Sequence, residues 1–138
     1  MTTFLIDTGP LVAFFNRHDH FHEWAGTIFE MLPESVYTTE PVLTEAVYFL
    51  KKWKADYAEL LNLVENGTLQ IDFQLSDSVS VLRALMAKYH PRMDLADASL
   101  VAAAQAVGDC QVVTIDREDF QTYRLLDRKK LDIVAPPG

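Results

Sequence analysis

The feature that most constrains the fold is a short apolar run near the start of the sequence, Phe4-Leu5-Ile6, which ends in Asp7-Thr8-Gly9-Pro10. An apolar run bounded by turn-favouring residues is typical of a buried strand in a parallel sheet. In open α/β sheets, ligands bind beyond the carboxyl ends of the strands. The sequence therefore predicts that a rigid central strand carries Asp7 to the edge of the sheet where chemistry takes place.

A second strongly apolar strand is predicted over residues 111–115, and an acid, Asp116, follows it. Shorter strands are expected over residues 36–38, 69–73 and 133–134. Helices are expected over residues 11–15, 19–32, 40–53, 56–65, 76–89 and 95–107. Their predicted N-caps include Asp19, Ser76, Asp94 and either Thr38 or Thr39. Strands that alternate with helices indicate one domain over residues 1–138, a three-layer α/β/α sandwich with a mostly parallel central sheet.

The composition narrows the class of protein. A chain of 138 residues, 49% of them hydrophobic, can bury a substantial core. Its net charge of −8 argues against broad, sequence-independent adhesion to nucleic acid, but leaves room for a local basic groove. No apolar run reaches the roughly 18 residues of a membrane span, and the first residues lack the basic region of a signal peptide. With a single cysteine, Cys110, a cytoplasmic protein is expected.

Four carboxylates stand out by their context. Asp7 and Asp116 directly follow apolar strands. Asp97 lies in the first turn of an alanine-rich helix, three residues after Asp94. Glu45 lies among apolar residues on the helical stripe that should face the core, where a carboxylate needs a polar partner or a cation.

Each acid, taken alone, has an ordinary structural explanation. Asp94 suits a helix N-cap, and Asp97 suits the positive end of a helix dipole. Asp116 and Asp119 suit turns, and Asp7 suits an Asx turn. Acids that converge on one rim, however, repel one another unless some are protonated or a cation neutralises them. Oxygen ligands of this kind favour Mg²⁺ or Mn²⁺, and such a site suits hydrolysis of a phosphodiester.

Three other interpretations are weaker. Asp-Thr-Gly is also the tripeptide of aspartic proteases, but those folds are rich in β-structure, and helical patterns surround this one. A phospho-acceptor of the haloacid-dehalogenase type resembles Asp-x-Asp, and this chain has Gly9 at the second position. His18, His20 and His22 suggest a metal site, but alternate residues on a helix do not face one another, so structural or surface roles are expected.

Four motifs follow one another along nearly the whole chain. They are Asp7-Thr8-Gly9-Pro10-Leu11-Val12-Ala13, Thr44-Glu45-Ala46, Met93-Asp94-Leu95-Ala96-Asp97-Ala98 and Val113-Thr114-Ile115-Asp116-Arg117-Glu118-Asp119-Phe120. In this order they resemble the PIN domain, specifically the VapC-like toxins. The resemblance implies a Mg²⁺- or Mn²⁺-dependent endoribonuclease, with Asp7, Glu45, Asp97 and Asp116 at the family's acidic positions and Thr114 at its hydroxyl position. Asp94 competes with Asp97 for its position, and Asp119 is an alternative to Asp116.

The resemblance also implies partners. These are an RNA substrate, a second copy of the chain in a homodimer, and a small antitoxin that blocks the acidic cleft. The dimer surface is expected around Trp53 and Tyr57, because large aromatic residues at a helix end seek cover. The candidate contacts to RNA phosphates are Lys51, Lys52, Lys54, Arg124 and Arg128. The alternative function is a catalytically silent PIN-fold module that binds RNA or protein.

Overall fold

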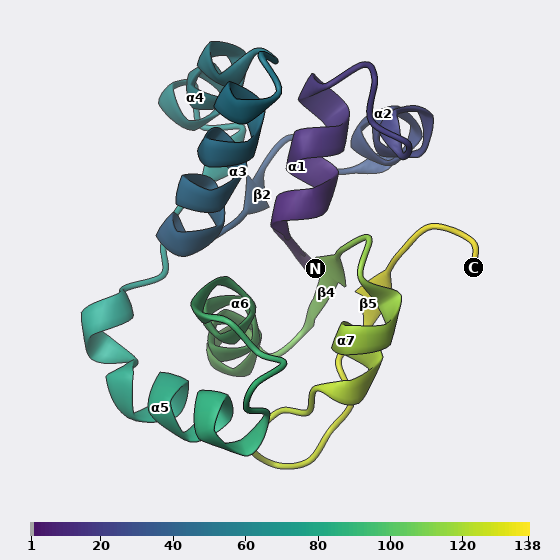
Figure 1. The fold of residues 1–138 in the computed structure, drawn as a ribbon. Coiled ribbons are helices and arrows are strands. Elements are labelled where there is room, and N and C mark those ends of the chain that lie inside the picture. The colour runs from purple at the N-terminus through teal and green to yellow at the C-terminus, as the bar shows by residue number, and fades with distance from the viewer. Residues whose placement is uncertain (1) are drawn as a thin grey trace.

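The computed structural model describes residues 2–138, and strands alternate with helices along the chain (Figure 1). The strands are β1 (Thr3–Ile6), β2 (Val36–Tyr37), β3 (Leu69–Gln70), β4 (Cys110–Val113) and β5 (Ile133–Val134). The helices are α1 (Thr8–Phe15), α2 (His22–Met31), α3 (Glu40–Lys52), α4 (Tyr57–Glu65), α5 (Val79–Lys88), α6 (Leu95–Val107) and α7 (Arg117–Thr122), with a 3₁₀ turn η1 (Leu75–Asp77). In this part of the chain, no helix combines the length and apolar character that crossing a membrane requires.

The central sheet has five strands in the order β3-β2-β1-β4-β5, and every pairing is parallel. Helices α1 to α4 lie on one side of the sheet and α5 to α7 on the other (Figure 1). The predicted three-layer α/β/α architecture is confirmed. From β1 the chain builds outward to β2 and β3 on one side, and later to β4 and β5 on the other. The junction of β1 and β4 is therefore the switch point at which α/β proteins bind their ligands.

The alanine-rich helix α6 packs closely against the sheet because its buried side chains are small. Its fully or nearly fully buried alanines are Ala96, Ala98, Ala102, Ala103 and Ala104. Buried Ser99 bonds through Oγ to Thr39 Oγ1 over 2.6 Å, which ties α6 to the N-terminus of α3 on the other side of the sheet. The predicted ends of α6 are confirmed: Asp94 Oδ1 accepts from Asp97 N over 2.8 Å, and Gly108 follows the last turn with φ of 88°.

Two predicted N-caps are wrong. Asp19 accepts instead from Phe21 N over 2.8 Å, in an Asx turn that precedes α2, and α2 begins at His22 without a side-chain cap. Ser76 lies inside the 3₁₀ turn η1, so the backbone becomes α-helical only at Val79. The cap at Thr39 is confirmed, with Oγ1 accepting from Val42 N over 3.4 Å.

Three strands are shorter than predicted, and one helix was not predicted. β2 ends at Tyr37, one residue before its predicted end. β3 ends at Gln70 because it is an edge strand whose only neighbour, β2, is two residues long. β4 ends at Val113, and the chain then leaves the sheet for α7, which Asp116 caps by accepting from Asp119 N. The short α7 places Phe120 and Tyr123 in the core.

Gly9 is needed where α1 approaches the loop after β4. A Cβ added at Gly9 would lie 2.7 Å from Ile115 Cδ1 and closer still to its Cγ1. We expect Gly9→Ala to lower the free energy of unfolding by about 1–3 kcal/mol, because Ile115 or the backbone must move. Gly26→Ala in α2 is the matched control, since nothing lies within 4 Å of its added Cβ. It should stabilise by roughly 0.5–1 kcal/mol. Urea unfolding of both variants checks this, and equal effects would contradict it.

Candidate active site

The register of β1 against β4 places Asp7 beside Thr114. Ile6 pairs with Val113, so the residues that follow lie side by side at the carboxyl edge of the sheet. Thr114 Oγ1 donates to Asp7 Oδ2 over 2.8 Å, and Thr8 N donates to Asp7 Oδ1 over 2.8 Å. Asp7 is 7% exposed and Thr114 is fully buried. Two hydrogen bonds and the sheet therefore hold the Asp7 carboxylate in one orientation.

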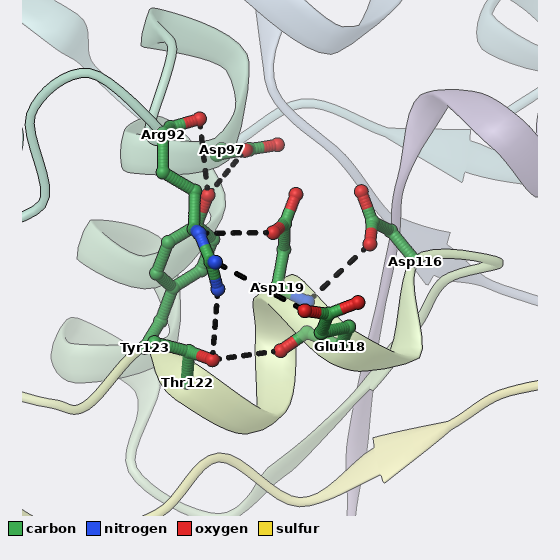
Figure 2. A network of polar contacts seen from close by, with 7 residues as sticks. All are labelled: Arg92, Asp97, Asp116, Glu118, Asp119, Thr122 and Tyr123. Carbon is green, nitrogen blue, oxygen red and sulfur yellow. Dashed lines mark hydrogen bonds and ion pairs between the residues drawn. The ribbon is translucent and has the colours of Figure 1, made fainter.

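Asp97 reaches the same region from the first turn of α6. Its Oδ2 accepts from the Tyr123 hydroxyl over 2.8 Å, as Figure 2 shows. The Tyr123 ring is fully buried and packs edge-on against Tyr89 and Phe120, each with ring centroids 5.2 Å from its own. Sequence reasoning gave Tyr123 no role at the site. The available signal was general: a buried tyrosine hydroxyl needs a hydrogen-bond partner.

Asp116 is the N-cap of α7 and Asp119 lies in its first turn, and the two differ in their partners. Asp116 N donates to Thr114 Oγ1 over 3.0 Å, and Asp116 Oδ1 accepts from Asp119 N over 3.3 Å. Asp119 forms an ion pair with Arg92, 3.4 Å from Oδ1 to Nε (Figure 2). Within residues 2–138, Asp116 forms no ion pair. Arg92 is a second residue that sequence reasoning missed.

Asp7, Asp97, Asp116, Asp119 and Arg92 line one hollow of about 330 Å³, which we call the acidic cleft. Glu45 joins it from α3, where it is half-buried. The lining contains seven acids and one cation: Asp7, Asp19, Glu45, Asp94, Asp97, Asp116, Asp119 and Arg92. The cleft therefore brings together the four predicted acids and both alternatives, with Thr114 behind Asp7.

Burial raises the pKa of several carboxyl groups in the cleft. Desolvation is the largest cause in each case, and it brings the pKa of Asp7 to about 6 and that of Asp97 to about 8. Hydrogen bonds from Thr114 and Thr8 oppose the shift at Asp7, and the hydroxyl of Tyr123 opposes it at Asp97. Neighbouring acids add to both shifts. The charge in the cleft is therefore only partly compensated by the protein.

The donor chemistry of the cleft fits a divalent cation. Its candidate ligands are carboxylate oxygens, and Thr8 Oγ1 is a buried hydroxyl without a hydrogen-bond partner. Within the part of the chain that the structure describes, no three His, Cys, Asp or Glu side chains are close enough together to hold a metal ion. The carboxylates would have to turn inward, toward a common point, for three of them to share one ion.

The predicted RNA-contact residues lie outside the acidic cleft. Lys51 and Lys52 are exposed at the end of α3, and Lys51 Nζ lies 6.0 Å from the centre of the Tyr57 ring. Arg124 donates to the carbonyl groups of Gln121, Thr122 and Tyr123 at the end of α7. Arg128 is exposed, and Lys54 lines a neighbouring hollow.

Among the three histidines, His22 has a structural contact. Its Nδ1 lies 2.7 Å from the carbonyl oxygen of Ala13, which joins the start of α2 to α1. His18 and His20 are exposed, and the His20 ring packs edge-on against Phe21.

The raised pKa values predict how stability depends on pH in metal-free protein. The carboxyl groups of Asp7 and Asp97 stay protonated in the folded state above the ordinary pKa of 3.8, at which the unfolded chain releases its protons. Stability should therefore fall as pH rises, through about 6 for Asp7 and about 8 for Asp97. We expect the melting temperature in chelator to fall between about pH 5 and pH 8, and Asp97→Asn to flatten the upper half of that fall.

The matched control is Asp56→Asn at the N-cap of α4, outside the cleft, which should keep the slope of the wild type. Parallel curves for the wild type and Asp97→Asn would show that this carboxyl group does not titrate in that range.

Known proteins share this fold. Mycobacterium tuberculosis VapC20, a toxin that cleaves the sarcin-ricin loop, is 17% identical over 80% of this chain and 87% of that one, with a TM-score of 0.71. A toxin-antitoxin complex from Klebsiella pneumoniae is 20% identical over 98% of both chains, with a TM-score of 0.70. DNA-bound VapBC from Salmonella typhimurium is 22% identical over 96% of this chain and 98% of that one, with a TM-score of 0.61.

Sequence comparison is informative at the level of the family. A search of curated protein sequences finds no match. The family model of the PIN domain, in contrast, matches residues 4–130, which include all the acids of the cleft. The resemblance seen in the four motifs is confirmed, and the chain belongs to the PIN-domain family.

Proposed function

We propose that this protein is a metal-dependent endoribonuclease that hydrolyses RNA phosphodiester bonds and is the toxin of a toxin-antitoxin pair. The observation that carries the proposal is the convergence of four predicted acids on one cleft at the switch point of the sheet, where Arg92 is the only cation in the lining. Membership of the PIN-domain family supports it, as does the fold shared with VapC20, a toxin that cleaves the sarcin-ricin loop.

In this proposal Asp7, Glu45, Asp97 and Asp116 hold one or two Mg²⁺ or Mn²⁺ ions. A bound ion of this kind lowers the pKa of a coordinated water and stabilises negative charge on phosphate oxygens. The chain's own task is to orient the ligands. Thr8 and Thr114 hold the Asp7 carboxylate, and Tyr123 holds Asp97. Asp116 is exposed at the mouth of the cleft.

A catalytically silent PIN-fold module that binds RNA or protein is the second candidate. One observation favours it: in the described residues, no three potential ligands are close enough to hold an ion. Titration calorimetry with Mn²⁺ separates the two candidates. The nuclease should bind the ion with an affinity that falls in Asp7→Asn, whereas a silent module should give no heat of binding.

The proposed partners follow from the relatives. Two of the three solved structures described above are toxin-antitoxin complexes, which supports a small antitoxin that covers the cleft. A homodimer is also proposed, with its surface at Tyr57, which is 41% exposed. Trp53, at 50% exposed, lines the acidic cleft and stays accessible there. An RNA substrate and the free thiol of Cys110 agree with a cytoplasmic location.

The first test separates catalysis from folding. Asp7→Asn and Asp116→Asn keep the side-chain shape but remove a charge. Mg²⁺- or Mn²⁺-dependent cleavage of a mixed RNA pool should therefore fall by roughly 100-fold or more, because losing only a hydrogen-bond partner of a metal ligand already costs about 10–100-fold. Melting temperatures of the same samples should stay equal or rise slightly, because a repelling carboxylate has gone.

Two controls accompany this test. Asp94→Asn should keep capping α6, because Asn caps helices about as well as Asp, and Asp56→Asn alters a cap outside the cleft. Both should cleave RNA at close to the rate of the wild type. Wild-type cleavage by Asp7→Asn and Asp116→Asn would mean that this cleft is not the site of a metal-dependent nuclease.

A second test uses stability alone. An ion that binds only the folded state stabilises it by about 2.7 kcal/mol when its free concentration is 100 times its dissociation constant. Millimolar Mn²⁺ should therefore raise the melting temperature of the wild type and of Asp56→Asn by similar amounts. Asp97→Asn should respond much less. Equal shifts in all three proteins would place the bound ion elsewhere.

A further inference from the structure

Trp53 lies between the acidic cleft and a second hollow. It lines both, and it is 50% exposed. The second hollow has a volume of about 370 Å³, and we call it the basic hollow. Its lining comes from the end of α1, the turn that follows, the start of α2 and the residues just after α3: Phe15, Asn16, Arg17, His18, His22, Trp53, Lys54 and Ala55. The two hollows therefore meet at one aromatic side chain.

The charge changes sign across Trp53. Counted over residues 2–138, the acidic cleft contains seven acids and one cation, whereas the lining of the basic hollow contains Arg17, Lys54 and two histidines but no acid. Within residues 2–138, neither Arg17 nor Lys54 forms an ion pair. In a chain of net charge −8, two unpaired cations in a concave site form a local environment suited to an anion.

The indole of Trp53 has one supported face. The ring of Phe49, one turn earlier on α3, stacks against it with centroids 5.2 Å apart and an interplanar angle of 22°. Glu45, Phe49 and Trp53 are spaced four residues apart, so they follow one stripe of the helix. The stripe leads from an acid of the cleft to a stacked aromatic pair. Such a pair offers a rigid surface on which an unpaired base can stack.

We propose that Trp53 and the basic hollow form a subsite for one nucleotide of single-stranded RNA, next to the acidic cleft. The base stacks on the Trp53 indole, and Arg17 and Lys54 contact the phosphate. The inference deepens the proposed ribonuclease function, on which it rests, by assigning the residues that would hold the substrate strand beyond the acidic cleft: Trp53, Arg17 and Lys54. Cations beside the acidic cleft offset the repulsion between its carboxylates and the RNA backbone.

A nucleotide fits this surface better than a protein partner does. Lysine is depleted at protein interfaces, whereas Lys54 lies beside the indole in the same hollow. A nucleotide presents the matching features, because its base has an aromatic face and its phosphate carries a negative charge. The hollow also falls within the range of about 300–1,000 Å³ that is usual for small-molecule sites.

The experiment measures binding without cleavage. A fluorescent single-stranded RNA hexamer of mixed sequence is titrated with full-length protein in chelator. Trp53→Ala should weaken binding by roughly 5- to 150-fold, the effect of losing one base–aromatic stack. Arg17→Gln and Lys54→Gln should each reduce the slope of log affinity against log salt by about 0.7, the value for one phosphate of a single strand.

Matched controls distinguish a subsite from general surface effects. Tyr57→Ala removes another exposed aromatic residue, and Lys88→Gln another exposed lysine, and neither residue lines either hollow. Both variants should bind as the wild type does. The chain has two tryptophans, so Trp24→Phe leaves Trp53 as the only one. The fluorescence of the Trp24→Phe variant should be quenched by the unlabelled hexamer, while the fluorescence of the Trp53→Phe variant should not change. Thermal melts establish that each variant folds.

The outcomes are distinct. If Trp53→Ala binds RNA as tightly as Tyr57→Ala does, the subsite is refuted, whether or not the wild type cleaves RNA. If Trp53→Ala keeps full RNA affinity but sediments as a monomer where the wild type is a dimer, the surface belongs to a second copy of the chain and the proposal fails. If binding depends on Trp53 but Mg²⁺ or Mn²⁺ never supports cleavage, the subsite stands and the nuclease function falls.

Discussion

The hydrogen bond from Thr114 to Asp7 is the contact on which the site depends. It joins the residues that follow β1 and β4, the two neighbouring strands from which the strand order continues in opposite directions. Asp7 can be buried because Thr114 and Thr8 satisfy both of its oxygens. The Thr114 hydroxyl also accepts from Asp116 N. One small side chain therefore positions both Asp7, which follows β1, and Asp116, which lies beyond β4. Gly9 adds to this arrangement by letting α1 approach Ile115.

The cleft concentrates like charges at a cost to stability. The protein limits that cost locally: Arg92 pairs with Asp119, and the Tyr123 hydroxyl donates to Asp97. Asp7 and Asp97 nevertheless have raised pKa values, because burial disfavours their charged forms more than these hydrogen bonds favour them. A bound cation would offset this cost, because it stabilises the ionised carboxylates that burial and mutual repulsion disfavour. The cations of the basic hollow beyond Trp53 offset the negative charge of the cleft on one side only.

Local sequence signals predicted the elements whose causes are local. The limits of α6 were predicted because Asp94 caps it and Gly108 ends it, both within the helix's own neighbourhood. Elements that depend on distant partners were not predicted correctly. β3 stops at Gln70 because β2 offers it only two residues, and Ser76 lies in a 3₁₀ turn rather than at the start of α5. Neither outcome is encoded in the residues at those positions alone.

The sequence by itself determined the fold class and the identities of the candidate acids, because the apolar strands, the residues that follow them and the helix caps are all short-range patterns. Only the tertiary structure decided which side chains meet. It paired Asp119 with Arg92, placed Tyr123 against Asp97, and set Trp53 between hollows of opposite charge. The physical reason is that these contacts join residues that lie near in space but far apart in sequence, and they depend on strand register and helix packing, which no local pattern specifies.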